Sequence, residues 1–171
     1  MKRNYNYFKP TPKTLEELKA QYRKLAFEHH PDRGGNMDVM KAVNNEYDEL
    51  FAKLKDVHQT KDGETYTARQ ATSETADQFK DLISELMKMD NIEIEIIGCF
   101  VWVTGNTKQY KNKLKELKFK WHNKKIAWYL KPDDYRRKSR REYGLDEIRE
   151  MYGTNGKVNS KGTTKLDEVG A

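Results

Sequence analysis

Pro31 separates two helical apolar patterns in the first third of this 171-residue chain. Before it, apolar side chains recur at steps of three and four residues, which predicts an amphipathic helix: Leu15, Leu18, Tyr22, Leu25 and Ala26. Thr14, with Glu17 three residues later, predicts a capping box at the start of that helix, and Pro31 disfavours helix at His30. After the loop sequence DRGGN, a second helical face follows: Met37, Met40, Val43, Tyr47, Leu50, Phe51 and Leu54. We expect two antiparallel helices that bury these faces against each other.

The composition limits the core and the class of protein. Hydrophobic residues make up 36% of the chain and charged residues 35%, so any core must be small. The single cysteine, Cys99, argues against a disulfide framework and a cysteine-based zinc site, and it favours a reducing, cytoplasmic setting. No apolar run approaches the roughly 20 residues that a membrane span needs, and the basic N-terminus lacks the apolar stretch of a secretory signal. We therefore expect no membrane partner.

The whole chain is predicted to be α+β, with a helical N-terminal part and a mixed C-terminal part. Residues 1–55 form the helical hairpin. Residues 56–75 have little apolar content and no clear period, and they are predicted to be a linker. Residues 76–153 form a small basic α+β domain, and the polar residues 154–171 form a disordered tail.

The small domain is predicted from patterns in the order helix–strand–strand–helix–strand–strand. ADQFKDLISELMKM has a helical apolar stripe, and NIEIEIIG alternates strictly, as a half-buried strand does. CFVWVTG follows as a second strand and NTKQYKNKLKEL as a basic amphipathic helix, while KFKWH and IAWYL are short strands around the turn-like NKK. We expect these strands to form an antiparallel sheet, with a last short helix in DEIREMYG.

The histidines beside Pro31 raise the question of a metal or catalytic site. Adjacent histidines point in divergent directions, and the other two, His58 and His122, lie in different segments, so no metal site is expected. A base at His30 oriented by Asp32 would need a nucleophile and a substrate pocket, and the sequence positions neither. We therefore expect no catalytic residue, no cofactor and no enzymatic activity.

The same loop is also predicted to be a capped turn. Asp32 would bond nearby backbone N–H groups, Pro31 would fix the bend, and Gly34-Gly35 would supply unusual backbone angles. A turn does not explain the basic residues just upstream, Lys19, Arg23 and Lys24, which lie near one another on the first helix. They are either a solvated helix surface or a docking face.

The stretch ELKAQYRKLAFEHHPDRGG resembles helix II and the signature loop of a J-domain, the module by which DnaJ-type co-chaperones engage DnaK-type chaperones. The matching features are a Tyr-basic-basic-Leu-Ala run ahead of His-Pro-Asp, a basic residue straight after it, and an amphipathic helix containing NNEYDELF. The resemblance covers residues 14–54. It implies that the chain has no active site of its own and stimulates the ATPase of a DnaK-type partner by favouring its hydrolysis-competent state. It implies these chaperone-binding residues: His30, Pro31, Asp32, Tyr22, Arg23, Lys24, Lys19 and Arg33.

The N-terminus departs from the family pattern. Family members usually open with a short helix I, but Pro10 and Pro12 argue against a full helix here. We expect an extended segment whose aromatic residues, Tyr5, Tyr7 and Phe8, pack on the hairpin. A further hypothesis is therefore a degenerate J-fold that no longer engages a chaperone.

The basic character of the chain belongs to one segment. Residues 105–141 carry 14 basic and 3 acidic side chains, a balance of +11 against +6 for the whole chain. With interleaved aromatic residues, this charge is typical of nucleic-acid binding, in which cations neutralise phosphates and exposed rings stack on bases. The alternatives are that the tryptophans form the core of the domain and that YRRKSRR binds an acidic protein. The candidate nucleic-acid-binding residues are Arg136, Arg137, Lys138, Arg140, Arg141, Lys124 and Lys125.

Two functional hypotheses follow. The first is a co-chaperone whose C-terminal domain recruits a client protein that the sequence does not identify. The second is a nucleic-acid-binding accessory protein of a phage or mobile element that uses the hairpin to recruit the chaperone. The C-terminal pattern resembles that of short J-domain proteins in phages and mobile elements of Firmicutes-type bacteria, which would place the protein in the bacterial cytoplasm.

Overall fold

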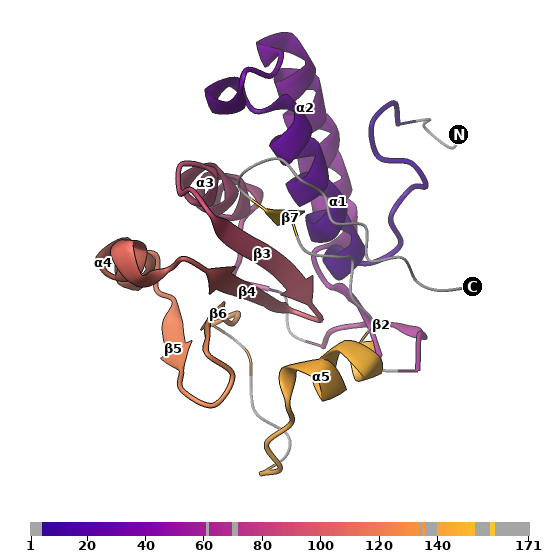
Figure 1. The fold of residues 1–171 in the computed structure, drawn as a ribbon. Helices are drawn as coiled ribbons and strands as arrows, with labels where there is room; N and C mark the ends of the chain where they lie inside the picture. The colour runs from indigo at the N-terminus through magenta and orange to yellow at the C-terminus, as the bar shows by residue number, and fades with distance from the viewer. Residues whose placement is uncertain are drawn as a thin grey trace, which may run out of the picture. The chain divides into compact units, whose positions relative to one another are not determined.

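A computed structural model describes residues 5–60, 62–69, 72–133, 135, 140–152 and 158–159. These residues form an α+β protein whose sheets are antiparallel (Figure 1). The chain divides into two compact units, Met1–Lys88 and Met89–Ala171, and each is described separately. None of the helices in the described ranges has the length and apolar content needed to cross a bilayer.

The first unit is built on a pair of antiparallel helices, α1 (Leu15–His29) and α2 (Met37–Leu54) (Figure 1). Most of the predicted apolar faces are buried, and the rings of Tyr22 and Tyr47 meet with centroids 4.4 Å apart. Met37, which was predicted to lie on the buried face of the second helix, is 57% exposed at the start of α2. At the start of α1, the Thr14 hydroxyl accepts a hydrogen bond from the Glu17 N–H at 3.3 Å. The Glu17 carboxylate turns to the Lys13 N–H at 2.8 Å, so the cap reaches one residue further back than a capping box does.

The N-terminal segment packs on this hairpin without forming a helix, as predicted. Phe8 is fully buried and its ring lies 6.4 Å from that of Tyr47. The N–H groups of Asn6 and Tyr7 donate to the carboxylate of Glu46 at 2.8 and 3.0 Å. These bonds satisfy backbone groups that a helix would have paired internally.

The predicted linker, residues 56–75, contains a β-hairpin. Strand β1 (Val57–Gln59) pairs antiparallel with β2 (Thr65–Thr67). The β-branched residues favour strands, and Gly63 adopts φ +84°, which the Asp62-Gly63 turn requires. His58 Nδ1 lies 2.7 Å from Glu16 Oε1, so β1 is tied to α1.

The helix α3 (Ala76–Met87) belongs to the first unit, whereas the sequence assigned it to the C-terminal domain. The reason is aromatic packing: Phe79 is 1% exposed, with its ring 6.0 Å from the rings of both Tyr22 and Tyr47. Lys80 also bonds Asp48 of α2 at 2.6 Å. The boundary therefore lies after Lys88 and not at residue 75.

The second unit is an antiparallel sheet in the order β5-β6-β4-β3-β7. The strands β3 and β4 are joined by a tight turn that contains Gly98, which adopts φ +56°. The predicted strands, helix and final helix are all present: β3 (Ile92–Ile97), β4 (Phe100–Gly105), α4 (Lys111–Glu116), β5 (Lys120–His122), β6 (Ala127–Leu130) and α5 (Leu145–Tyr152). A short 3₁₀ turn, η2 (Lys108–Tyr110), precedes α4.

The strand register assigns the tryptophans to different faces of this sheet. Trp121 is paired with Trp128, which is paired with Val103, so these three share one face. Trp102 lies on the opposite face, in a cluster with Ile97 and Ala127 against which α5 packs Leu145 and Ile148. Trp102 and Trp128 are buried, as the core interpretation predicts, whereas Trp121 is 42% exposed.

The tail also contains paired backbone. Of the predicted disordered residues 154–171, the structure describes β7 (Val158–Asn159), which pairs antiparallel with Glu93 and Ile94 of β3. The rest of that segment lies outside the described residues. A strand edge offers unpaired N–H and C=O groups, and this short pairing occupies those of β3.

Candidate functional site

The connection between α1 and α2 is a short, tightly determined turn. His30 ends α1 with extended backbone, as a residue before proline should, and its N–H still donates to the Ala26 carbonyl at 2.9 Å. Pro31 then begins a single 3₁₀ turn, η1 (Pro31–Arg33), where its missing N–H removes no bond. The signature tripeptide is therefore partly the end of one helix and partly the start of another turn.

Two glycines and an asparagine close the connection. Gly34 adopts φ +78°, the left-handed conformation that ends η1. At Gly35, an added Cβ would lie 2.2 Å from the backbone carbon of His29, so a side chain cannot fit there. Asn36 then caps α2, with its Oδ1 accepting from the N–H groups of Asp38 and Val39. A capped turn is confirmed, but the predicted role of Asp32 is wrong: the capping side chains are His30 and Asn36, and the Asp32 carboxylate lies 3.7 Å from His30 Nδ1.

The His30 side chain points inward and links the turn to α3. Its Nδ1 accepts from the Asp32 N–H at 3.3 Å, and its Nε2 lies 3.0 Å from Ser84 Oγ. With Nδ1 as the acceptor, Nε2 is the ring nitrogen that can donate to the Ser84 hydroxyl. His30 is 9% exposed, so its imidazole shapes the turn from within.

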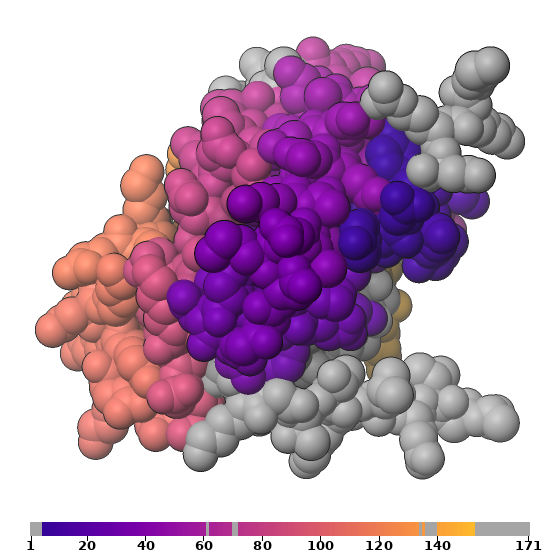
Figure 2. Space-filling model, turned by 90° about the horizontal axis from the view of Figure 1, so that it is seen from above, coloured from indigo at the N-terminus to yellow at the C-terminus, as the bar shows by residue number. Residues whose placement is uncertain are grey.

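The tip of the turn is the accessible part. Pro31 and Asp32 are exposed, and the Asp32 side chain retains 52% of its accessible surface. Arg33 is half-buried because its guanidinium lies 4.2 Å above the Phe27 ring, a cation–π contact that fixes its direction. Figure 2 views the molecule from the end of the hairpin that carries this connection.

Three of the predicted docking residues on α1 are buried. Tyr22 is 2% exposed, Arg23 is fully buried and Lys19 is 5% exposed. Among the predicted basic residues of α1, Lys24 is the exposed one. The sequence prediction of an open basic face on α1 is therefore wrong for Lys19 and Arg23, which are both buried, and a later segment of the same unit covers Lys19.

Lys19 shows how that cover is made. Its ammonium bonds Glu74 Oε2 at 2.5 Å and lies 5.1 Å from the centre of the Phe79 ring. A buried lysine needs such a partner, since an unpaired buried charge is costly. Glu74 directly precedes Thr75, whose hydroxyl caps α3, so the same short stretch neutralises Lys19 and begins the covering helix.

Tyr22 and Lys80 hold the three helices of the first unit together. The Tyr22 hydroxyl donates to Asn44 Oδ1 at 2.9 Å. Burial, and then the charges of Asp48 and Asp81, raise the pKa of Tyr22, so it stays a neutral donor. Burial alone would lower the pKa of Lys80, but hydrogen bonds to Asp48 and Asp77 outweigh it and raise that pKa.

The structure describes four of the seven predicted nucleic-acid-binding residues. Arg136, Arg137 and Lys138 lie outside the described residues. Arg140 and Arg141 are exposed, and the Arg141 guanidinium lies 5.0 Å from the Tyr143 ring and 3.5 Å from Glu147. The remaining two, Lys124 and Lys125, line a hollow.

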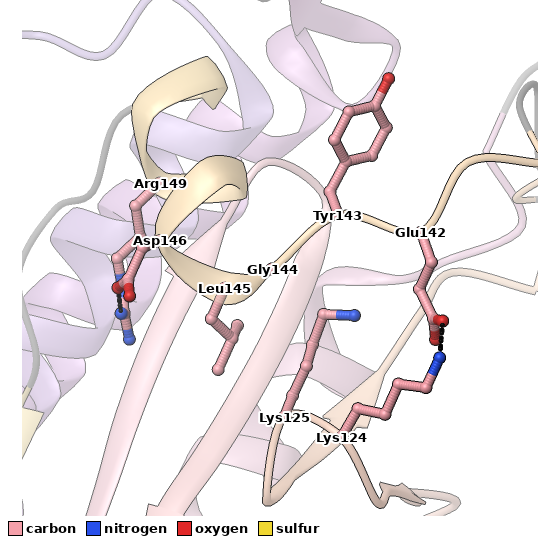
Figure 3. A pocket seen from close by; sticks show the side chains of 8 residues that line it. All are labelled: Lys124, Lys125, Glu142, Tyr143, Gly144, Leu145, Asp146 and Arg149. Atoms are coloured by element: carbon pink, nitrogen blue, oxygen red, sulfur yellow. Dashed lines mark hydrogen bonds and ion pairs between the residues drawn. The ribbon is translucent and has the colours of Figure 1, made fainter.

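This hollow lies between the β5–β6 turn and the start of α5, and its volume is about 450 Å³ (Figure 3). Lys124 bonds Glu142 at 2.6 Å, and this bond lowers the pKa of the Glu142 carboxyl. Arg149 bonds Glu95 through two parallel contacts of 2.9 and 2.8 Å. In the lining of the hollow, Lys124 is thus paired with Glu142, and Arg149 with Asp146 and buried Glu95.

His122 lies beside this hollow and is held neutral. Burial first, and then the positive charge of Lys125, lower the pKa of the imidazole. Lys125 Nζ lies 3.0 Å from His122 Nε2, and Glu142 lies 3.3 Å away. Within the described ranges, no three His, Cys, Asp or Glu side chains come close enough to hold a metal ion.

Sequence reasoning missed Glu74, Phe79 and Ser84 as parts of the site. Phe79 appeared in the helical stripe that predicted α3, but nothing in the stripe says which partner it covers. Ser84 and Glu74 are polar residues with no motif around them. Their contacts to His30 and Lys19 join positions more than 50 residues apart.

Comparison of the chain with protein-family models, curated proteins and solved structures finds no match.

Proposed function

We propose that the first unit is a J-domain-like co-chaperone module that binds a DnaK-type chaperone through the exposed turn Pro31–Arg33 and stimulates its ATPase. The observation that carries the proposal is the conformation of this turn and the exposure of its side chains. It lies at the end of a helical hairpin, it is fixed by His30, Gly35 and Asn36, and it exposes the Asp32 carboxylate beside Pro31. A rigid polar turn of this kind suits recognition of one defined site on a partner, because little order remains to be imposed on binding.

Each exposed group has a distinct role in this proposal. The Asp32 carboxylate accepts hydrogen bonds from the partner, while Arg33 and Lys24 supply the positive charge that steers the encounter. No group of the turn performs chemistry itself. The module acts by binding the hydrolysis-competent state of the chaperone more tightly than its other states.

The buried basic residues are given a structural role here. Lys19 holds α1 against the segment that contains Glu74 and Phe79, Arg23 is fully buried, and Tyr22 joins α1 to α2. The contact surface offered to the chaperone is therefore smaller than the resemblance implies, and it centres on the turn. The second unit, Met89–Ala171, would recruit the client protein.

Single-turnover ATP hydrolysis by a bacterial DnaK-type chaperone tests the proposal. We expect acceleration by the native chain and loss of acceleration with Asp32→Asn, which removes the exposed charge and retains the shape. Asp38→Asn is the matched control, because Asp38 is a nearby carboxylate in the first turn of α2 whose side chain is 92% exposed. Equal rates for the native chain and Asp32→Asn would overturn the proposal, as would an equal loss with Asp38→Asn.

A further inference from the structure

The surface of α4 and β5 carries one sign of charge. Residues 105–131, all described, contain nine lysines and one acidic residue, Glu116. The lysines at positions 108, 111, 113, 115, 118 and 120 are all exposed. A region with so little counter-charge creates a positive field that attracts polyanions.

Within α4, the lysines divide into two groups. Leu114 is fully buried and marks the inner side of the helix. With about 3.6 residues per turn, Lys111 and Lys115 fall on one flank of that side. Lys113 falls on the opposite flank, where its ammonium lies 3.9 Å from Glu116. Neither Lys111 nor Lys115 has an ion pair within the described residues. The two ammonium groups on this flank can therefore interact with a bound molecule.

An exposed indole follows these lysines along the chain. Trp121 lies on β5, the edge strand of the sheet, and its ring contacts Trp128 at 5.5 Å between centroids while 42% of it stays exposed. Lys118 and Lys120, just before it, are exposed as well. Lysine on an edge strand discourages association of sheets, and this explains Lys120. It does not explain a large exposed ring on the same strand.

The turn after β5 presents a second apolar group to solvent. Ile126 is 72% exposed and adopts φ +50°. A β-branched residue rarely takes this left-handed conformation, and such strain is often kept at binding sites. An isoleucine at this position does not help to prevent edge-to-edge association of sheets, as a lysine would. Trp121 and Ile126 together make the β5–β6 hairpin an apolar contact within a basic surface.

We propose that this surface binds single-stranded nucleic acid, with the lysines contacting phosphates and Trp121 stacking on an unpaired base. A positive groove with exposed rings is the general design of single-strand binding, whereas the bases of a duplex are already stacked. An acidic protein would use the lysines but would gain nothing specific from the indole. The inference is independent of the proposed function, because it involves only the second unit. The surface is defined by Lys111, Lys115, Lys118 and Trp121.

Fluorescence anisotropy of the full chain with a labelled oligothymidine of about 16 nucleotides tests the proposal. We expect saturable binding that weakens steeply as salt rises from about 50 to 200 mM. An oligouridine arm distinguishes RNA from DNA, and tighter binding of either one supports the proposal. A duplex of the same length should bind more weakly. Absence of binding to both single strands at the lower salt, or equal binding of the duplex, would overturn it.

The two flanks of α4 give a matched pair of variants. Lys115→Gln should lower the slope of log affinity against log salt by about 0.7, the value for one lost phosphate contact on a single strand. Lys113→Gln removes the same charge from the same helix but from the flank of Glu116, so its slope should equal that of the native chain. An equal decrease of the slope in the two variants would mean that binding depends only on net charge, and it would overturn the proposed surface.

Two substitutions separate stacking from packing at Trp121. Trp121→Phe keeps an aromatic ring and should bind within a few fold of the native chain. Trp121→Leu keeps apolar contact with Trp128 but cannot stack, and it should weaken oligothymidine binding about tenfold. Circular dichroism of both variants confirms that they fold. Native affinity in Trp121→Leu, or displacement of the oligonucleotide by polyglutamate at equal charge concentration, would show a site for acidic polymers in general.

Discussion

Two helices of this protein carry basic side chains one turn apart, and the fold places them in opposite environments. On α1, Lys19 and Arg23 are buried. On α4, Lys111 and Lys115 have the same spacing and are exposed. The difference is that Glu74 and α3 return to cover one side of α1, whereas the flank of α4 stays open. A basic i, i+4 pair on a helix therefore predicts a shared face, but not whether that face meets solvent.

The comparison also separates two uses of positive charge. Both members of the buried pair lie inside the unit, and Lys19 is neutralised there by Glu74. The exposed pair has no counter-charge within the described residues and is available to a polyanion. Each use predicts a different response to substitution, and the predictions below run from the largest expected effect to the smallest.

The packing of α3 on α1 should depend strongly on the Phe79 ring. Phe79→Ala removes a side chain that is 1% exposed and lies against Tyr22 and Tyr47. We expect the free energy of unfolding of the first unit to fall by about 3–5 kcal/mol. Hydrogen exchange of the α1 and α2 amides measures this directly. A loss below about 1 kcal/mol would mean that α3 does not pack on α1.

Substitution of Lys19 on α1 and of Lys115 on α4 should change the free energy of unfolding by different amounts. Lys19→Ala leaves Glu74 without its partner in a mostly buried position, so a loss of about 2–3 kcal/mol is expected. Lys115→Ala changes an exposed position and should alter stability by no more than about 0.5 kcal/mol. Chemical denaturation of the two variants, followed by hydrogen exchange, gives both values. Similar losses at the two positions would break the contrast between α1 and α4.

The link between the turn and α3 should contribute a smaller amount. Ser84→Ala removes the hydroxyl that lies 3.0 Å from His30 Nε2. A loss of about 1 kcal/mol is expected for one such hydrogen bond, with faster exchange at the Asp32 and Arg33 amides. Unchanged exchange at these amides would indicate that His30 holds the turn without help from α3.

The second unit should show a weak pH dependence that comes from His122. Because the folded-state pKa of His122 is lowered, the unfolded chain takes up the proton more readily as pH falls below about 6.5, the ordinary value. Stability contributed by the neutral ring is therefore present above that pH and lost below it. Lys124, Lys125 and Glu142 face the ring. His122→Gln should lessen the loss, measured by tryptophan fluorescence, since all three tryptophans lie in this unit. An unchanged pH profile in the variant would assign the loss to other groups.

Much of the fold follows from local patterns. The stripes of α1, α2 and α3 and the alternation of β3 were sufficient to predict those elements, because each reflects a period of its own backbone. The hairpin β1–β2 was missed because its strands have three residues each and its faces are only partly buried. The Asp62-Gly63 turn between Val57 and Thr65 was the available signal.

The environment of the candidate sites was less predictable than the elements. His30, Pro31 and Asp32 were singled out from their position after the Tyr-basic-basic-Leu-Ala run, and a capped turn was predicted there. The burial of Lys19 depends on contacts with residues more than 50 positions later, which no local period encodes. The alternative that placed all three tryptophans in the core is wrong for Trp121, because composition does not show that its strand is the edge of the sheet.

Lysine reactivity in the native full-length chain tests the contrast between α1 and α4 most directly. Brief acetylation, followed by mass spectrometry of the peptides, reports each ammonium separately. We predict rapid modification of Lys24, Lys111 and Lys115 and strong protection of Lys19 until denaturant unfolds the first unit. Lys24 is the internal control, since it lies on α1 and is exposed. Modification of Lys19 at the rate of Lys24 would show that α1 presents an open basic face and would contradict the covered arrangement described above.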